Sequence, residues 1–183
     1  MAVLVIKSFK EDNKHNIFDL FDIEDAVYDG LNRNNEEYET YSIDEKKLCF
    51  YKNRDYLFHN PELIVSLYEK MIKADSIVFL FDNECRKNIR TVLYLMRTFL
   101  SKDKSRGLIG LKRKKYLMLM YGNSSYGQYG SLFKDFNELE EISKVLWDFR
   151  MELIDVILIT FANIHYIRKI IPEAIITLVN FPC

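Results

Sequence analysis

Three segments of the chain carry polar, cationic and glycine residues that are suited to holding phosphate groups and planar ligands. Residues 7–16 read KSFKEDNKHN, residues 82–86 read DNECR, and residues 121–130 read YGNSSYGQYG. Hydroxyl, amide and ammonium groups donate hydrogen bonds, glycine permits close backbone approach, and tyrosine rings stack on aromatic ligands. The candidate ligand contacts are Ser8, Lys10, Lys14, His15, Asn16, Asp82, Asn83, Tyr121, Gly122, Asn123, Ser124, Ser125 and Tyr126.

Other kinds of chemistry find no support in the residue spacing. The three cysteines, Cys49, Cys85 and Cys183, include no C-x-x-C pair, and the three histidines are isolated. We therefore expect neither a disulfide framework nor a metal site. No nucleophilic triad, phosphate-binding P-loop or pair of glycosidase carboxylates can be assembled from the pattern, so we assign no catalytic residue.

The three polar segments each follow a short apolar run, which is typical of a buried strand. Amphipathic stretches at helical spacing separate these runs and predict helices between them. The predicted strands are Ala2 to Ile6, Glu37 to Ile43, Ser76 to Phe81, Tyr116 to Met120 and Ile154 to Thr160. The predicted helices are centred on Leu20 to Leu31, start at Pro61, and cover Arg86 to Leu100 and Leu132 to Phe149.

Strands that alternate with helices predict an α/β fold, a three-layer sandwich in which helices cover both faces of a five-stranded parallel sheet. We expect the strand order 2-1-3-4-5 in a single domain over residues 1–183, with residues 161–183 as an atypical, apolar C-terminal tail. Right-handed crossovers would then bring the three polar segments to one edge of the sheet. Ligands bind at such an edge, where the strand order reverses.

The composition of the chain limits the kinds of partner and the cellular compartment that we expect for the protein. The chain has 183 residues and a formal net charge of -1, so nothing attracts the whole molecule to nucleic acid or to an anionic membrane. No apolar stretch reaches the roughly 18 residues of a membrane span, and the opening MAVLVIK lacks a basic leader. We expect a cytoplasmic protein that binds neither nucleic acid nor membrane.

A resemblance to a known family rests on three pieces of sequence. These are LFHNP at residues 57–61 with YEKMIKADSIVF at residues 68–79, the opening MAVLVIKSF, and MLMYGNSSYG at residues 118–127. Over roughly residues 2–160 the chain resembles the NAD(P)H-dependent FMN reductases of the flavodoxin-like fold, including the iron–sulfur flavoproteins. The resemblance implies FMN bound across the three loops, where it takes hydride from NAD(P)H and passes electrons to a second acceptor.

The loops depart from the family pattern, which keeps other functions open. The family's first loop is G-S-P-R-x-x-G/S-x-T, of which only Ser8 and Lys10 have matches, and its T-P-x-Y loop after the third strand is absent. The cysteine cluster of the iron–sulfur branch is reduced to Cys49, which cannot hold a cluster. An alternative is a cofactor-free flavodoxin-like domain with a structural, assembly or regulatory role. A phosphoacceptor receiver domain would use Asp82, but Lys7 and Ser8 occupy the place of its acidic pair.

The helix Arg86 to Leu100 and the C-terminal tail have more apolar surface than one sheet face can cover, which predicts a homodimer. The helix Arg86 to Leu100 has a broad apolar face, and the tail adds more aliphatic residues. In the resembled family, dimers bind flavin near such an interface. Trp147 follows Leu146 on a helical stripe and is expected in the core or at an interface. Arg86, Lys87 and Arg90 are either a solvated helix face or contacts for a dinucleotide phosphate.

Overall fold

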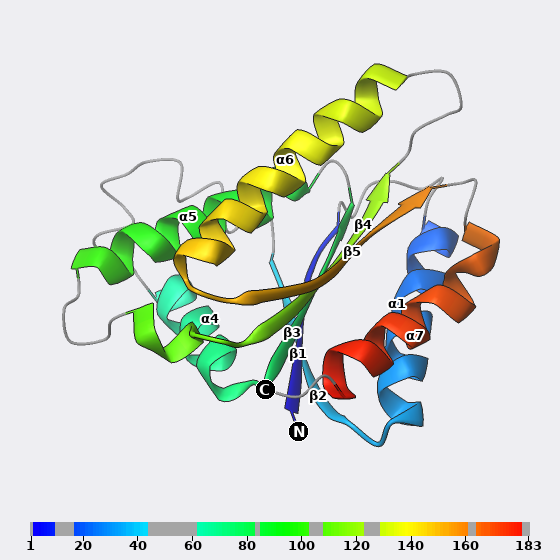
Figure 1. The fold of residues 1–183 in the computed structure, drawn as a ribbon, viewed down its shortest axis with the longest axis horizontal. Helices are drawn as coiled ribbons and strands as arrows, with labels where there is room; N and C mark the ends of the chain where they lie inside the picture. The colour runs from blue at the N-terminus through cyan, green and yellow to red at the C-terminus, as the bar shows by residue number, and fades with distance from the viewer. Residues whose placement is uncertain are drawn as a thin grey trace.

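The computed structural model describes residues 2–9, 17–43, 62–82, 85–102, 108–122, 129–160 and 164–180. Five strands form one sheet in the order β2-β1-β3-β4-β5, and each neighbouring pair is parallel (Figure 1). The strands are β1 (Ala2–Ser8), β2 (Glu37–Ser42), β3 (Ser76–Asp82), β4 (Lys115–Gly122) and β5 (Glu152–Thr160). The predicted strand order and the parallel sheet are confirmed.

Helices cover both faces of this sheet. In Figure 1, α1 (Ile17–Arg33) and α7 (Ile167–Asn180) lie on one side, and α4 (Glu62–Lys73), α5 (Arg86–Lys102) and α6 (Tyr129–Asp148) lie on the other. Two short 3-10 helices, η2 (Leu108–Leu111) and η3 (Ile164–Tyr166), precede β4 and α7. The three-layer α/β sandwich expected from the sequence is therefore confirmed.

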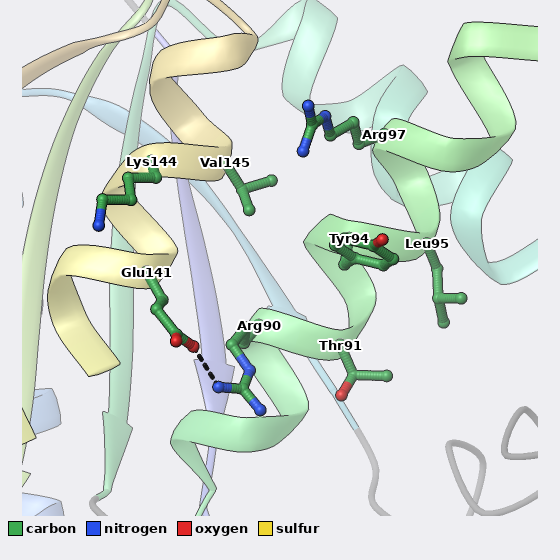
Figure 2. A pocket seen from close by; sticks show the side chains of 8 residues that line it. All are labelled: Arg90, Thr91, Tyr94, Leu95, Arg97, Glu141, Lys144 and Val145. Atoms are coloured by element: carbon green, nitrogen blue, oxygen red, sulfur yellow. Dashed lines mark hydrogen bonds and ion pairs between the residues drawn. The ribbon is translucent and has the colours of Figure 1, made fainter. Parts of the chain in front are cut away.

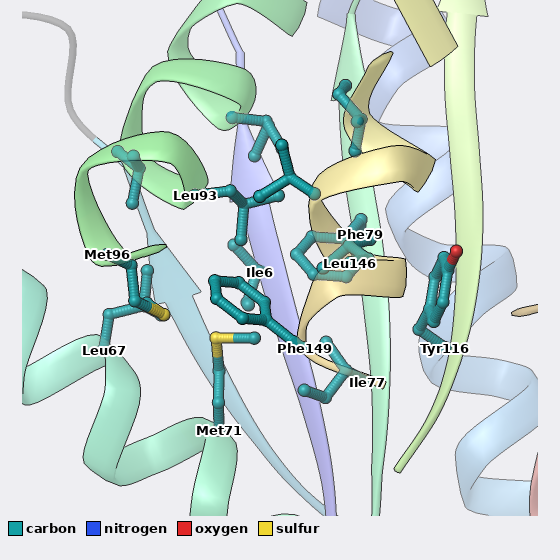
Figure 3. Close-up of a cluster of buried hydrophobic side chains, with 14 of the residues drawn as sticks. Ile6, Leu67, Met71, Ile77, Phe79, Leu93, Met96, Tyr116, Leu146 and Phe149 are labelled. Atoms are coloured by element: carbon teal, nitrogen blue, oxygen red, sulfur yellow. The ribbon is translucent and has the colours of Figure 1, made fainter. Parts of the chain in front are cut away.

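The central strands are apolar because both of their faces are buried. Every residue of β3 is buried, and so is every residue of β4. Leu4 and Ile6 of β1 join the cluster under α4, α5 and α6, shown in Figure 3, whereas Val3 and Val5 face the cluster under α1 and α7. This alternation fixes the register of the strands, since a slip of one residue would turn each side chain to the opposite layer.

The apolar tail of the sequence forms α7, which packs along α1. Its buried residues are Ile167, Ile171, Pro172, Ala174, Ile175 and Leu178. The two helices approach closely at Gly30, where an added Cβ would lie 3.0 Å from the Pro172 Cα and 3.2 Å from the Ile175 Cβ. The tail therefore owes much of its apolar character to the layer that it completes over the sheet.

A non-glycine residue with positive φ, Arg150, caps α6 two residues after the helix ends, and this conformation leads to a stability prediction. The Arg150 amide donates to the Trp147 carbonyl at 2.7 Å, and the Met151 amide donates to the Leu146 carbonyl at 3.2 Å. These two hydrogen bonds form the pattern of a Schellman cap. Arg150 adopts φ 58°, where an L side chain is strained. We expect Arg150→Gly to raise the free energy of unfolding by about 0.5 to 1 kcal/mol in urea titrations. Arg150→Ala removes the same side chain but keeps the strain; an equal gain from it would contradict this explanation.

Candidate functional site

The carboxyl ends of β1, β3 and β4 meet at one edge of the sheet. Ser8 at the end of β1 pairs with Phe81 of β3, and Asp82 at the end of β3 pairs with Tyr121 of β4. The chain passes from β1 outward to β2 and then returns to β3 on the other side of β1, so the strand order reverses between β1 and β3. Open α/β sheets bind ligands at this position. The structure thus brings Ser8, Asp82, Tyr121 and Gly122 to the ends of adjacent strands.

Ser8 is enclosed at this edge and has a partner within the protein. Its side chain is only 1% exposed, and its hydroxyl donates to the Ile43 carbonyl across 3.4 Å. The Ile43 amide donates to the Lys7 carbonyl at 2.8 Å. Ser8 therefore helps to join the segment that follows β2 to the end of β1. A phosphate here would have to draw its hydrogen bonds mainly from main-chain amides and from other side chains.

Asp82 shapes the turn between β3 and α5. Its side chain is 6% exposed, and Oδ1 accepts a hydrogen bond from the Cys85 amide at 2.6 Å. The Cys85 carbonyl in turn accepts from the Asn88 amide at 2.8 Å and thereby begins α5. A carboxylate near a helix N-terminus is stabilised by the helix dipole. Asp82 thus holds the turn that leads from the end of β3 into α5.

The last two residues of β4, Tyr121 and Gly122, have different surroundings. Tyr121 is buried and belongs to the core cluster under α1 and α7, so its ring packs inside the protein. At Gly122, an added Cβ would meet the Leu158 Cδ1 at 3.5 Å and the Ile159 oxygen at 3.9 Å. Both are ordinary contact distances. As far as its described neighbours show, the packing at this position does not require a glycine.

The other candidate contacts divide into those outside the described residues and those with partners. Lys10, Lys14, His15, Asn16, Asn83, Asn123, Ser124, Ser125 and Tyr126 lie outside the described residues. Arg86 is buried at the start of α5, Lys87 is exposed, and Arg90 forms an ion pair with Glu141 of α6. Lys87 is therefore solvated, Arg90 is partly exposed within a surface ion pair, and Arg86 alone of the three is buried.

One ion pair near the edge was not anticipated from the sequence. Lys7 Nζ lies 3.1 Å from Glu24 Oε1, and both side chains are largely buried between β1 and α1. The signal was available, because Lys7 interrupts an otherwise apolar strand. Removing one partner of such a pair leaves the other charge poorly solvated. The pair therefore fixes α1 against the strand whose end forms the candidate site.

Neither a metal-binding group nor a membrane-spanning helix occurs among the described residues. Among them, no group of three or more His, Cys, Asp and Glu side chains is placed to hold a metal ion. Within that part of the chain, none of the helices has the length and apolar character of a membrane span.

The strand order and the two helical layers define a flavodoxin-like fold. The chain is similar in structure to an NAD(P)H:quinone oxidoreductase from Methanothermobacter marburgensis, with a TM-score of 0.71, 11% identity, and coverage of 100% of this chain and 99% of that one. It is also similar to an FMN-dependent NADH-azoreductase from Bacillus anthracis in complex with FMN, with a TM-score of 0.65, 10% identity, and coverage of 98% and 99%.

No protein-family model and no curated protein sequence matches the chain. An NADPH-quinone reductase from P. pentosaceus shares the fold as well, with a TM-score of 0.62, 9% identity, and coverage of 100% of both chains. At identities this low, structural similarity establishes the fold. The resemblance to NAD(P)H-dependent FMN reductases seen in the sequence is confirmed at that level.

Proposed function

We propose that the protein binds FMN at the carboxyl edge of β1, β3 and β4 and transfers electrons from NAD(P)H to a second acceptor. The observation that supports this proposal is the reversal of strand order between β1 and β3, with the carboxyl ends of β1, β3 and β4 at the same edge of the sheet. The similar structures include an azoreductase in complex with FMN and two quinone reductases.

The described residues suit the flavin through their backbone more than through their side chains. When bound, FMN would supply the hydride and electron chemistry. The N-terminus of α1 offers main-chain amides and a positive dipole end for the phosphate, and Gly122 presents no side chain at the end of β4. Lys10, Lys14, His15, Asn16, Asn83 and residues 123–126 remain predicted contacts.

A cofactor-free flavodoxin-like domain is the second candidate, and specific contacts favour it. Ser8 and Asp82 both make hydrogen bonds within the protein, and the Tyr121 ring lies in the core. The edge would then serve only to join strands and helices, and the protein would act in assembly or regulation.

We also propose a homodimer located in the cytoplasm, built from one domain per chain. The support for the dimer is exposed aromatic surface on α5 and α6, where Tyr94 and Trp147 stand out from the layer. The support for the location is a near-neutral composition with few cysteines.

Flavin retention and turnover test the proposed function. We expect the purified chain to keep about one FMN per protein through gel filtration and to oxidise NAD(P)H faster than free FMN does. Gly122→Val adds a branched side chain at the end of β4, so we expect it to weaken FMN binding at least about tenfold, a loss of 1.4 kcal/mol. Gly122→Ala is the milder control, and urea unfolding of both variants verifies the fold. A chain that takes up no flavin at any concentration supports the cofactor-free domain instead.

A further inference from the structure

The amino ends of the strands lie at the edge of the sheet opposite to the carboxyl edge, and two turns meet there. The Arg113 amide, before β4, donates to the Arg150 carbonyl, before β5, at 2.8 Å. The Glu152 amide donates to the Lys114 carbonyl at 2.9 Å. Lys112, Arg113 and Arg150 are all exposed. Two turns from distant parts of the chain thus bring three solvated cations together.

Both arginines have a backbone conformation that favours glycine. The φ angle is 65° at Arg113 and 58° at Arg150. Arg113 is the third residue of a β-turn in which the Lys114 amide donates to the Leu111 carbonyl at 3.2 Å, and glycine or asparagine usually supplies a positive φ there. In the described part of the chain, Asn35 is the only other non-glycine residue with positive φ. Strained residues of this kind cluster at functional sites, which indicates a use for the two guanidinium groups.

The two arginines also differ from other surface arginines in their ion pairing. Four other arginines in the described part of the chain each pair with a carboxylate: Arg33, Arg90, Arg97 and Arg168. Figure 2 shows one of these pairs, in which Arg90 of α5 meets Glu141 of α6. Among the described residues, no carboxylate forms an ion pair with Lys112, Arg113 or Arg150. Their charges are therefore accessible to a ligand.

Positive charge is in excess around the two turns. Two carboxylates, Asp75 and Glu152, lie at the amino ends of the neighbouring strands, against the three exposed cations and the Lys114 ammonium. Asp75 Oδ2 accepts a hydrogen bond from the Ala2 amide at 3.0 Å. Lys114 Nζ donates to the Ala74 carbonyl, and burial lowers the pKa of Lys114 more than the charge of Asp75 raises it. Lys114 thus holds its turn against the start of β3, and the three exposed cations are left for a ligand.

We propose that Lys112, Arg113 and Arg150 bind an anionic ligand that carries two or more phosphate groups. A guanidinium group can donate two parallel hydrogen bonds to the oxygens of one phosphate. Because the hydrogen bond between the two turns sets the arginines side by side, each can meet one of two linked phosphates. An inorganic polyphosphate chain and the phosphates of a nucleotide share this chemistry. The site lies at the edge opposite to the proposed flavin site and does not depend on it.

Titration calorimetry with inorganic tripolyphosphate tests this site. We expect saturable binding to the wild-type protein, tighter than that of sulfate and weakened by added salt. The double variant Arg113→Gly with Arg150→Gly should weaken this binding at least about tenfold. The same variant should be more stable than wild type in urea, because glycine relieves the strain at both positions. Damage to the fold cannot explain a loss of affinity that accompanies a gain in stability. Lysine at both positions keeps the charges and should restore part of the affinity.

A matched control removes two exposed cations elsewhere on the molecule. Arg33→Ala with Lys87→Ala changes the net charge equally and should alter the affinity by less than about twofold. Adenosine triphosphate distinguishes the two sources: binding tighter than that of tripolyphosphate indicates a nucleotide, and equal or weaker binding indicates an inorganic chain. Three results would overturn the proposal: an affinity for tripolyphosphate no greater than for sulfate, binding that the double glycine variant leaves unchanged, or binding that FMN competes away.

Discussion

Replacing Gly30 by valine is expected to destabilise the protein by about 3 kcal/mol, at the upper end of the usual cost of overpacking. A Cβ at this position would lie 3.0 Å from the backbone Cα of Pro172 and 3.2 Å from two side-chain atoms of Ile175. Pro172 lies inside α7, so the nearest atom cannot move without the helix. The branched side chain would push α7 away from α1 and open the core cluster beneath both helices.

Chemical denaturation measures this cost, and two further variants test its cause. Helix propensity alone would make Gly30→Val slightly favourable, because glycine is the poorer helix former. Asp25→Val introduces the same side chain at an exposed position of α1 and should change stability by less than about 0.5 kcal/mol. Combining Gly30→Val with Ile175→Ala should cost less than the sum of the two single changes. A Gly30→Val protein as stable as wild type would contradict the described packing of α7 on α1.

The sequence was sufficient to predict the sheet, because each buried strand is an apolar run between amphipathic helices. The errors lie at the strand ends. The fourth strand was predicted from Tyr116 to Met120, but β4 runs from Lys115 to Gly122. A lysine and a glycine interrupt the apolar pattern, yet their backbones continue the parallel ladder to Glu152 and Thr160 of β5. Hydrophobic periodicity reports side-chain burial, whereas the ladder depends on the main chain.

The site was harder to predict, since residue type does not show which way a side chain points. Tyr121 follows Leu117 and Leu119 at a spacing of two residues, and all three join the cluster under α1 and α7. Strand alternation therefore contained the signal that the Tyr121 ring faces the core. Ser8 was chosen for its hydroxyl, but only the fold reveals that the Ile43 carbonyl accepts its hydrogen bond. Such long-range partners have no signature in local sequence.

The position of Trp147 around the axis of α6 shows whether its side chain lies in the core, which the residue type alone does not show. The buried residues at the end of α6 include Ile142, Val145 and Leu146, which share one side of the helix with Phe149 just beyond its end. Position 147 falls outside this stripe, and the structure leaves its side chain in solvent. The sequence predicted that the Trp147 side chain lies either in the core or at an interface, and its exposure excludes the core. An interface remains as a proposal, and the exposed indole is its main support.

Saturation with FMN is expected to raise the melting temperature by about 5 to 10 °C. A ligand that binds only the folded state stabilises it by about 2.7 kcal/mol at one hundred times its dissociation constant. For a chain of this length, each kcal/mol corresponds to roughly 2 to 4 °C. The effect depends on binding alone, so it is visible even if electron transfer is slow. Differential scanning calorimetry over a series of FMN concentrations measures it.

Riboflavin separates the contribution of the phosphate from that of the ring. If the start of α1 binds the phosphate through its free amides, riboflavin at the same concentration should give a clearly smaller shift. Gly122→Val should reduce the shift from both flavins, because it adds a side chain at the end of β4, where the proposed ring site lies. A melting temperature that stays constant up to the solubility limit of FMN would exclude the flavin proposal. The hydrogen bonds that Ser8 and Asp82 make within the protein would then indicate that the carboxyl edge of the sheet has a structural role.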